Sequence, residues 1–310
     1  MTSSNTRKPS FSRSSEHGTP VTDIPAAPPK THGRAGRNLP QAISLGVGLG
    51  AYVVLSLIFF EPAFVLLVAL ALMMASVELY RALQRQEMTA AIVPIAAGAI
   101  AIPFGSYLAG RENAVIEFST TSVLLGSLAL TVLAALIWRM RGGSKGYVKD
   151  AAASLMIIAY VPMLGSFAPL MLAEDHGAAR LVTFMLVVTM SDTGGLIGGV
   201  LFGKHPMAPK ISPKKSWEGF AGSMFFGIAA AVLMTIFVLD GPFWVGIIIG
   251  VCLVTVGTCG DLIESMIKRD LGIKDMSSFL PGHGGVMDRL DSLLVAAPVA
   301  WLIMYVLVPG

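Results

Sequence analysis

Residues 242–263 read PFWVGIIIGVCLVTVGTCGDLI, and this stretch decides the class of fold. Between Asp240 and Asp261 the chain carries no Asp, Glu, Lys or Arg side chain. An uncharged apolar run of roughly 18 residues or more can cross a bilayer as an α-helix, and soluble domains rarely contain one. The stretch therefore predicts a membrane-spanning helix that ends where Asp261 begins a polar segment.

The rest of the chain has the same character. Of its 310 residues, 54% are hydrophobic and 13% charged, and the mean hydropathy is +0.72. A closed barrel would show short alternating segments of about 10 residues, which the continuous runs do not resemble. We therefore expect an all-α integral membrane protein with about nine spans. The runs lie at about 42–60, 62–80, 89–110, 119–138, 151–173, 180–202, 219–239, 242–263 and 292–308.

The positions of Lys and Arg predict the orientation. With the amino terminus in the cytoplasm, 20 of the 22 Lys and Arg residues fall in cytoplasmic segments, and only Arg111 and Arg180 fall outside. This is the bias that cytoplasmic loops show in membrane proteins. We expect a multi-pass protein, in the plasma membrane, with its amino terminus and its polar segments facing the cytoplasm and its carboxyl terminus outside.

Three regions differ in composition. Residues 1–39 are rich in Ser, Thr, Pro and basic residues and are expected to form a disordered cytoplasmic tail. Residues 40–180 contain few ionisable groups within their apolar runs, apart from Glu78, and are expected to serve as a scaffold. Residues 181–310 hold most of the intramembrane polar residues, so we expect the functional site there.

Asp192 lies near the middle of the sixth run, between Ser191 and Thr193. A carboxylate at that depth costs at least ~3 kcal/mol on insertion scales, so it is expected to have a function. The alternative is a hydrogen bond to a neighbouring helix. The small-residue spacing of Gly194, Gly195, Gly198 and Gly199 predicts close packing against a second helix.

A lysine-rich loop follows that run. Lys204, Lys210, Lys214 and Lys215 could be an ordinary positive cytoplasmic loop in contact with anionic headgroups. The prolines at 206, 209 and 213 instead favour a stiff loop that holds ammonium groups in place. Ser216 is expected to cap the next helix, with Glu218 in its first turn.

The segment 261–292 is the strongest functional signal. Asp261, Glu264 and Lys268 share one helical face at the end of the eighth run. Asp288 and Asp291 repeat the spacing at the start of the ninth, where carboxylates suit the positive end of a helix. Carboxylate oxygens favour Mg²⁺, which in proteins is often completed by substrate phosphates.

Cationic side chains surround these carboxylates. The basic residues of the segment are Lys268, Arg269, Lys274, His283 and Arg289. Gly282, Gly284 and Gly285 let the backbone approach a ligand. A lone histidine is more often structural, but the glycines and ionisable groups around His283 favour a role in the site. Carboxylates for a metal and cations for phosphates indicate phosphoryl or nucleotidyl transfer.

Three stretches resemble one known family, the phosphatidate cytidylyltransferases. They are SPKKSWEG at 212–219, KRDLGIKD at 268–275 and LPGHGGVMDRLDS at 280–292, and with the Asp192 segment the resemblance covers about 190–295. The chain departs from the family at Gly195 and Leu196, where Ala-Tyr is usual. Ser216 replaces the commoner threonine and keeps the hydroxyl group.

The resemblance implies that CTP and phosphatidic acid react to give CDP-diacylglycerol and pyrophosphate, with Mg²⁺ and a second metal ion of unspecified identity. It implies a homodimer and no nucleic acid. It implies Asp261 and Asp288 as metal ligands, with Glu264 in support. The catalytic residues that it implies are Asp261, Asp288, Asp291, Lys268 and Arg269. The residues that it implies for phosphates and substrates are Lys215, Lys268, Arg269, Lys274, Arg289, Asp192, Lys210, Ser212, Ser216 and His283.

Two other functions fit parts of the pattern. A transferase that joins a lipid phosphate to a nucleotide-linked sugar phosphate would also need cytoplasmic carboxylates, Mg²⁺ and many helices. An ion-coupled transporter could use Asp192 as its coupling site, although no internal repeat is evident in the sequence.

Overall fold

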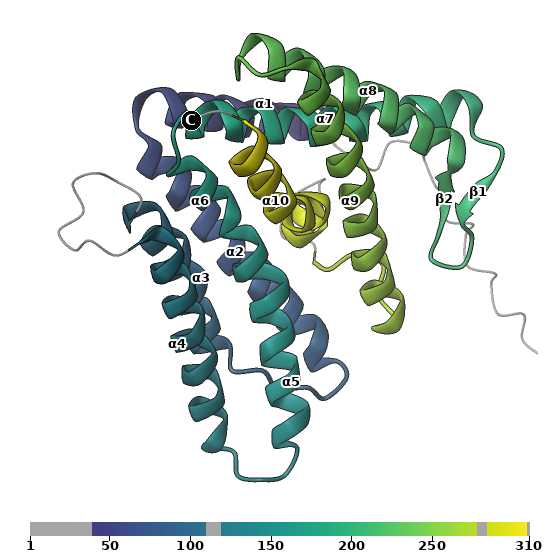
Figure 1. Cartoon of the computed structure of the whole chain (residues 1–310). Helices are drawn as coiled ribbons and strands as arrows, with labels where there is room; N and C mark the ends of the chain where they lie inside the picture. Colours follow the sequence, from purple (N-terminus) through teal and green to yellow (C-terminus); the bar gives the residue numbers. More distant parts are fainter. Residues whose placement is uncertain (1–38, 110–118, 278–283, 309–310) are drawn as a thin grey trace, which may run out of the picture. The chain divides into compact units, whose positions relative to one another are not determined.

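The computed structural model describes residues 39–109, 119–277 and 284–308, which are almost entirely helical (Figure 1). The prediction of an all-α protein is confirmed. Residues 1–38 of the predicted tail at 1–39 lie outside the described residues, as does His283, and Leu39 begins α1. The elements are α1 (Leu39–Phe59), α2 (Glu61–Gln84), α3 (Ile92–Ala109), α4 (Thr120–Met140), α5 (Tyr147–Ile158), the π-helical turn η1 (Ala159–Met163), α6 (Phe167–Leu172), α7 (Gly177–Phe202), β1 (Pro206–Ala208), β2 (Ser212–Ser216), α8 (Trp217–Phe237), α9 (Phe243–Asp270) and α10 (Met287–Leu307).

Eight helical segments in the described ranges are long and apolar enough to cross a membrane. Seven of them are single helices, and the eighth, Tyr147–Leu172, joins α5, η1 and α6. The first predicted run is also helical, but its apolar part, Gly46–Phe59, is shorter than the others. The chain is therefore a multi-pass membrane protein.

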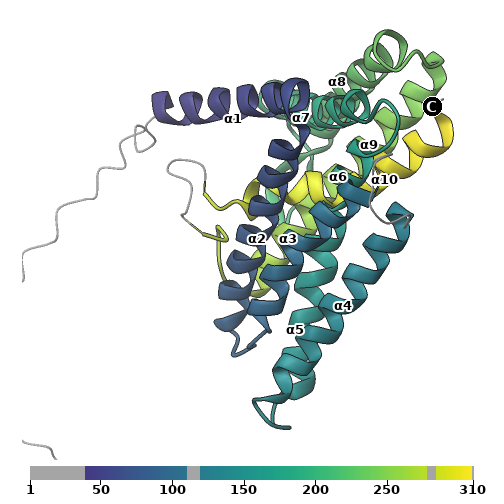
Figure 2. The ribbon, with the colours of Figure 1, turned by 90° about the vertical axis from the view of Figure 1, so that its left-hand side faces the viewer.

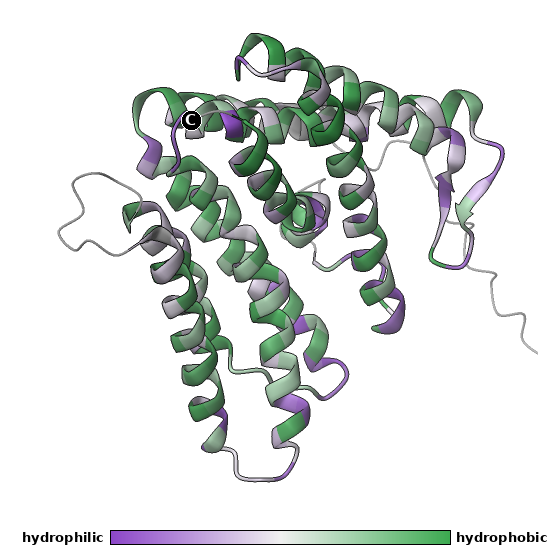
Figure 3. Cartoon of the chain, in the orientation of Figure 1, coloured by the Kyte–Doolittle hydropathy of each residue, from purple (hydrophilic) through white to green (hydrophobic). Residues whose placement is uncertain are grey.

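The helices are apolar on most of their circumference, as Figure 3 shows along their length. Large side chains such as Leu130, Val200 and Phe225 are 68%, 75% and 72% exposed. In water such surfaces would be unfavourable, whereas in a bilayer they face hydrocarbon. Polar colour gathers near helix ends and on the β-hairpin (Figure 3).

Glycines bring α7 and α8 into close contact, as the small-residue spacing predicts. A Cβ added to Gly194 would lie 2.5 Å from the carbonyl oxygen of Gly222, and one added to Gly198 would lie 2.7 Å from that of Glu218. Ser223 donates a hydrogen bond from Oγ to the Ser191 carbonyl, 2.7 Å away, which ties the two helices together. Helix α7 therefore holds Asp192 at a fixed distance from α8.

The lysine-rich loop forms a feature that the sequence did not predict. Strands β1 and β2 pair antiparallel, with Pro206 opposite Ser216 and Ala208 opposite Ser212, and the register shifts between them. A hydrogen bond from the Ile211 N–H to the Ala208 carbonyl closes the turn at 3.1 Å. The loop is thus a short β-hairpin between α7 and α8, which fixes where its lysines project.

Helix α10 packs against helices from both halves of the chain, namely α2, α6, α7 and α9. Helices α2 to α5 run side by side, and the α2–α3 and α4–α5 turns lie at one end of this group (Figures 1 and 2). The α8–α9 turn and the end of α10 lie toward the opposite end in both views. The start of α10 contacts both α2 and α9, through the Glu78–Met287 hydrogen bond and the Lys268–Asp288 ion pair.

Candidate active site

A polar cavity of about 360 Å³ opens where α7, β2, α8, α9 and α10 meet. Seven of the residues implied by the resemblance contribute to its wall: Asp192, Lys215, Ser216, Asp261, Asp288, Arg289 and Asp291. The other wall residues are Ser191, Gly195, Leu196, Gly199, Met207, Lys214, Gly219, Phe220, Ser223, Thr258 and Ser292. Side chains that are far apart in the sequence thus face one space.

Three helices each bring carboxylate groups to this cavity. Asp192 comes from the middle of α7, Asp261 from the last third of α9, and Asp288 and Asp291 from the first turns of α10. The Asp291 Oδ1 atom accepts a hydrogen bond of 2.7 Å from the Ser292 N–H. Several like charges around one cavity repel one another, and this repulsion favours the binding of cations.

The hairpin supplies a cation that pairs with a carboxylate of α9. Lys215 Nζ forms an ion pair with Asp261 Oδ2, which joins β2 to α9. Ser216 caps α8 by accepting a hydrogen bond of 3.1 Å from the Gly219 N–H, and Glu218 lies in the first turn, so both of those predictions are confirmed. Because β2 leads directly into α8, the cap fixes the end of the hairpin beside the cavity.

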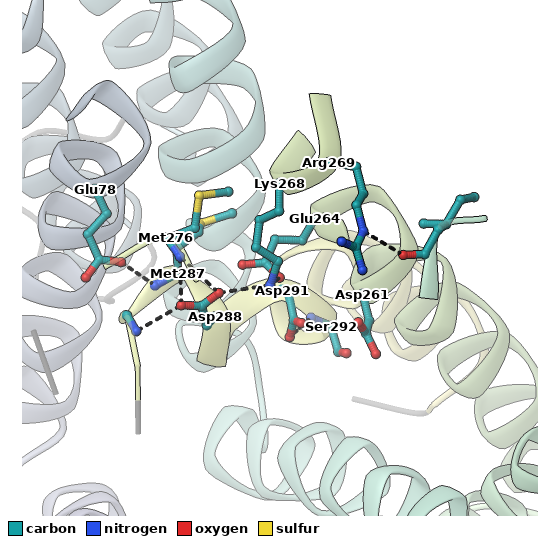
Figure 4. Close-up of polar contacts among 12 residues, drawn as sticks. Glu78, Asp261, Glu264, Lys268, Arg269, Met276, Met287, Asp288, Asp291 and Ser292 are labelled. Carbon is teal, nitrogen blue, oxygen red and sulfur yellow. Dashed lines mark hydrogen bonds and ion pairs between the residues drawn. The ribbon is translucent and has the colours of Figure 1, made fainter. Parts of the chain in front are cut away.

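Lys268 joins the carboxylates of α9 and α10 (Figure 4). Its Nζ atom forms ion pairs with Glu264 Oε2 and with Asp288 Oδ1, the latter at 2.9 Å. Glu264 is completely buried, and its Oε1 atom has no hydrogen-bond partner among the described residues. Lys268 therefore neutralises carboxylates of the protein itself, behind the cavity wall.

Asp288 also holds the backbone of the segment that precedes α10. Its Oδ2 atom accepts hydrogen bonds from the Gly285 N–H at 2.9 Å and the Met276 N–H at 3.1 Å (Figure 4). A carboxylate has about four lone-pair positions, so these bonds and the Lys268 contact leave capacity for a further ligand. Asp288 is thus fixed in orientation while still facing the cavity.

Several implied site residues lie outside the cavity wall. Arg269 donates a hydrogen bond of 3.2 Å from Nε to the Ile211 carbonyl, so it anchors the turn of the hairpin to α9. Lys210 and Lys274 are exposed. The implied residues that do not line the cavity are Lys210, Ser212, Glu264, Lys268, Arg269 and Lys274, and His283 is not described.

The cavity wall also includes residues outside the set that the resemblance implies. Lys214 is adjacent to Lys215, and Thr258 precedes Asp261 by three residues on α9, so helical spacing would have identified it. Ser191 and Ser223 meet only because α7 and α8 pack closely. No local pattern in the sequence carries that contact.

The donor set fits Mg²⁺ in its chemistry. The cavity wall offers carboxylate oxygens and hydroxyl groups, and within the described residues no three His, Cys, Asp or Glu side chains already form a metal cluster. Mg²⁺ typically uses one or two carboxylates together with water and substrate phosphates, so a complete protein cage is not required. Asp261 and Asp288 can supply that number of ligands, with Asp192 and Asp291 facing the same space.

Comparisons with known proteins identify the family of the chain. A sequence model of the cytidylyltransferase family matches residues 40–307. The phosphatidate cytidylyltransferase of Mycobacterium leprae is 41% identical over 290 residues, covering 88% of this chain and 90% of that protein. That of Mycobacterium bovis is 38% identical and covers 88% of this chain and 90% of its own length. That of Staphylococcus saprophyticus is 42% identical and covers 48% of this chain and 57% of its own length. The chain belongs to the cytidylyltransferase family.

Proposed function

We propose that the protein transfers a cytidylyl group from CTP to phosphatidate, which yields CDP-diacylglycerol and pyrophosphate. The observation that carries the proposal is the cavity in which Asp192, Asp261 and Asp291 face Lys215 and Arg289. Relatives that align over 88% of the chain are named phosphatidate cytidylyltransferases, which supports the same activity. Neither a sugar-phosphate transferase nor a transporter is favoured by these comparisons.

The reaction requires two polyanions to meet. An oxygen of the phosphatidate phosphate forms a bond to the α-phosphorus of CTP, and the bond from that phosphorus to the α,β-bridging oxygen breaks. Pyrophosphate leaves with the bonding electrons, so no side chain has to act as the nucleophile. Lys214, Lys215 and Arg289 line the cavity and would offset the repulsion between the phosphates.

We propose Asp261 and Asp288 as ligands of Mg²⁺, with Asp192 and Asp291 available for a second ion. When bound, Mg²⁺ would neutralise phosphate charge and stabilise the pyrophosphate that leaves. The chain's own contribution is orientation. Lys268 and the backbone N–H groups of Met276 and Gly285 hold the Asp288 carboxylate, and Lys215 holds Asp261.

Position-specific labelling tests the reaction. Purified protein in nanodiscs with phosphatidate and Mg²⁺ should transfer the label of [α-³²P]CTP to lipid, and the label of [γ-³²P]CTP should appear in pyrophosphate. EDTA should abolish both. If the α-label never enters lipid, the proposed reaction is wrong. Sugar-phosphate transfer from a nucleotide sugar, or ion flux without turnover, would then identify one of the two rival functions.

We also propose that the site faces the cytoplasm at the plasma membrane and that the protein is a homodimer. The Lys and Arg distribution supports the cytoplasmic placement, since 20 of 22 fall in the segments assigned to that side. Native mass spectrometry from nanodiscs should give twice the 32.6 kDa chain mass. A monomer mass at concentrations that support full activity would contradict the dimer.

A further inference from the structure

Glu78 is a carboxylate in α2 that lies outside the cavity wall and is only 4% exposed. Its partners lie about two hundred residues later in the chain. Oε1 accepts hydrogen bonds from Ser277 Oγ at 2.5 Å and from the Val286 N–H at 3.0 Å. Oε2 accepts one from the Met287 N–H at 2.8 Å (Figure 4). A buried carboxylate in a membrane protein is costly unless it has such partners.

These contacts make Glu78 the cap of α10. The first N–H groups of a helix have no partner within the helix, and a Ser, Thr, Asp or Asn at the N-cap usually accepts them. Here the N-cap residue is Val286, whose side chain has no acceptor. Glu78 supplies the acceptor from another helix and places its negative charge at the positive end of α10.

The same contacts join both ends of the segment before α10. Ser277 precedes residues 278–283, which lie outside the described ranges, and Val286 follows them. Asp288 also binds both ends of this segment, because its Oδ2 atom accepts hydrogen bonds from the Met276 and Gly285 N–H groups. A Cβ at Gly285 would lie 2.7 Å from Glu78 Oε2 and 2.9 Å from Asp288 Oδ2, so the chain passes closely between the two carboxylates.

We propose that Glu78 is a positioning residue for the reaction, because its cap fixes the first turn of α10 and with it the directions of Asp288 and Asp291. The inference rests on the proposed function for its kinetic consequence, but the cap itself does not. A carboxylate of the amino-terminal half thereby sets the geometry of a site that is built from the carboxyl-terminal half.

The test compares Glu78→Ala and Glu78→Gln with Ser76→Ala. Ser76 is a suitable control because it is buried two residues away on α2, and its Oγ donates only a local hydrogen bond to the Leu72 carbonyl. Glutamine keeps one carbonyl oxygen as acceptor, but its amide group would oppose one of the N–H groups. We therefore expect activity to decrease from the wild type to Glu78→Gln and again to Glu78→Ala.

Loss of a group that orients ligands typically costs about 10- to 100-fold in activity, and we expect this loss in kcat for Glu78→Ala. The KM for CTP should change much less, because orientation acts mainly on the transition state. Without substrates, hydrogen exchange should accelerate in peptides that cover 284–292 but not in α4. Ser76→Ala should match the wild type in both measurements.

Wild-type kcat in Glu78→Ala would overturn the proposal, and so would faster exchange that is equal along the whole chain. If the alanine variant does not fold, the glutamine variant decides: reduced kcat with faster exchange confined to the start of α10 supports the role, and wild-type values overturn it. Should the wild type itself form no CDP-lipid, the proposed function fails, whereas the exchange measurement still tests the cap.

Discussion

Asp261 lines the cavity beside the other carboxylates, and it forms an ion pair with Lys215 of the hairpin. We expect Asp261→Asn to lower kcat by about 100-fold or more, as loss of a preorganised charge at a reacting centre does. The fold should persist, because its side chain is 37% exposed and such ion pairs contribute about 0–1 kcal/mol.

The measurement is incorporation of labelled CTP into lipid, together with thermal unfolding in detergent. Asp270→Asn is the matched control, because Asp270 is exposed at the end of the same helix and does not line the cavity. Near-normal turnover in Asp261→Asn across a magnesium titration would show that Asp261 is not a metal ligand.

Lys268 leads to a prediction about stability. Removing one partner of a buried ion pair leaves an uncompensated charge, which typically costs about 3–5 kcal/mol. Lys268→Met should therefore reduce the free energy of unfolding by about 3 kcal/mol, because Glu264 is completely buried. The double variant Glu264→Gln with Lys268→Met should recover much of that loss.

Equilibrium unfolding in mixed micelles would measure these differences, with Lys274→Met as the control on an exposed lysine. Equal stability of Lys268→Met and the wild type would mean that Glu264 is neutral in the folded protein. A double variant no more stable than Lys268→Met would assign the loss to the Asp288 contact instead.

The sequence predicted several residues of the candidate site, but it did not predict which contacts they make. Spacing on a helix places Asp261, Glu264 and Lys268 on one face, and the structure has them on α9 as expected. The cap made by Glu78 was not predictable, because its partners include the backbone N–H groups of Val286 and Met287. Every residue except proline carries the same backbone N–H donor, so these donors give no sequence signal.

At the scale of elements, the close pair α7 and α8 makes a direct prediction. A Cβ at position 198 would lie 2.7 Å from the Glu218 carbonyl oxygen, so Gly198→Ala must separate the two helices. Overpacking of this kind costs about 1–3 kcal/mol. Gly126→Ala on α4 has nothing within 4 Å and should not lower the melting temperature.

Both variants are compared by thermal unfolding and by turnover. Gly198→Ala should also lose activity, because α7 carries Asp192 and α8 follows directly from the hairpin. An unchanged melting temperature for Gly198→Ala would mean that the helices adjust without cost.

The helices were predictable and the hairpin was not, for one physical reason. In a bilayer every backbone polar group must be satisfied internally, so a long apolar run indicates a helix. The segment 203–216 is predicted to lie in the cytoplasm, where water can satisfy the backbone. Its lysines and prolines hide any alternation of polar and apolar residues. Its pairing depends instead on anchors such as Arg269 and the Ile211 carbonyl.

At the scale of the whole molecule, the predicted orientation can be tested by labelling. In a background with Cys252→Ala and Cys259→Ala, single cysteines at Ser144, Lys210 and Asp240 report the α4–α5 turn, the hairpin and the α8–α9 turn. A membrane-impermeant maleimide should label position 240 in intact cells and positions 144 and 210 only after permeabilisation. The reverse pattern would mean that the protein has the opposite orientation, with the cavity on the outer side of the membrane.

The cap between α2 and α10 has a consequence for biosynthesis. Glu78 and Met287 are 209 residues apart, so the ribosome completes α2 long before α10 exists. During that interval the nascent chain holds an intramembrane carboxylate whose α10 backbone donors have not been made, a state that is costly in hydrocarbon. Insertion of the last helix removes that cost and adds Asp288, Arg289 and Asp291 to the cavity wall in the same event. A chain that terminates before α10 therefore lacks the backbone donors that satisfy Glu78.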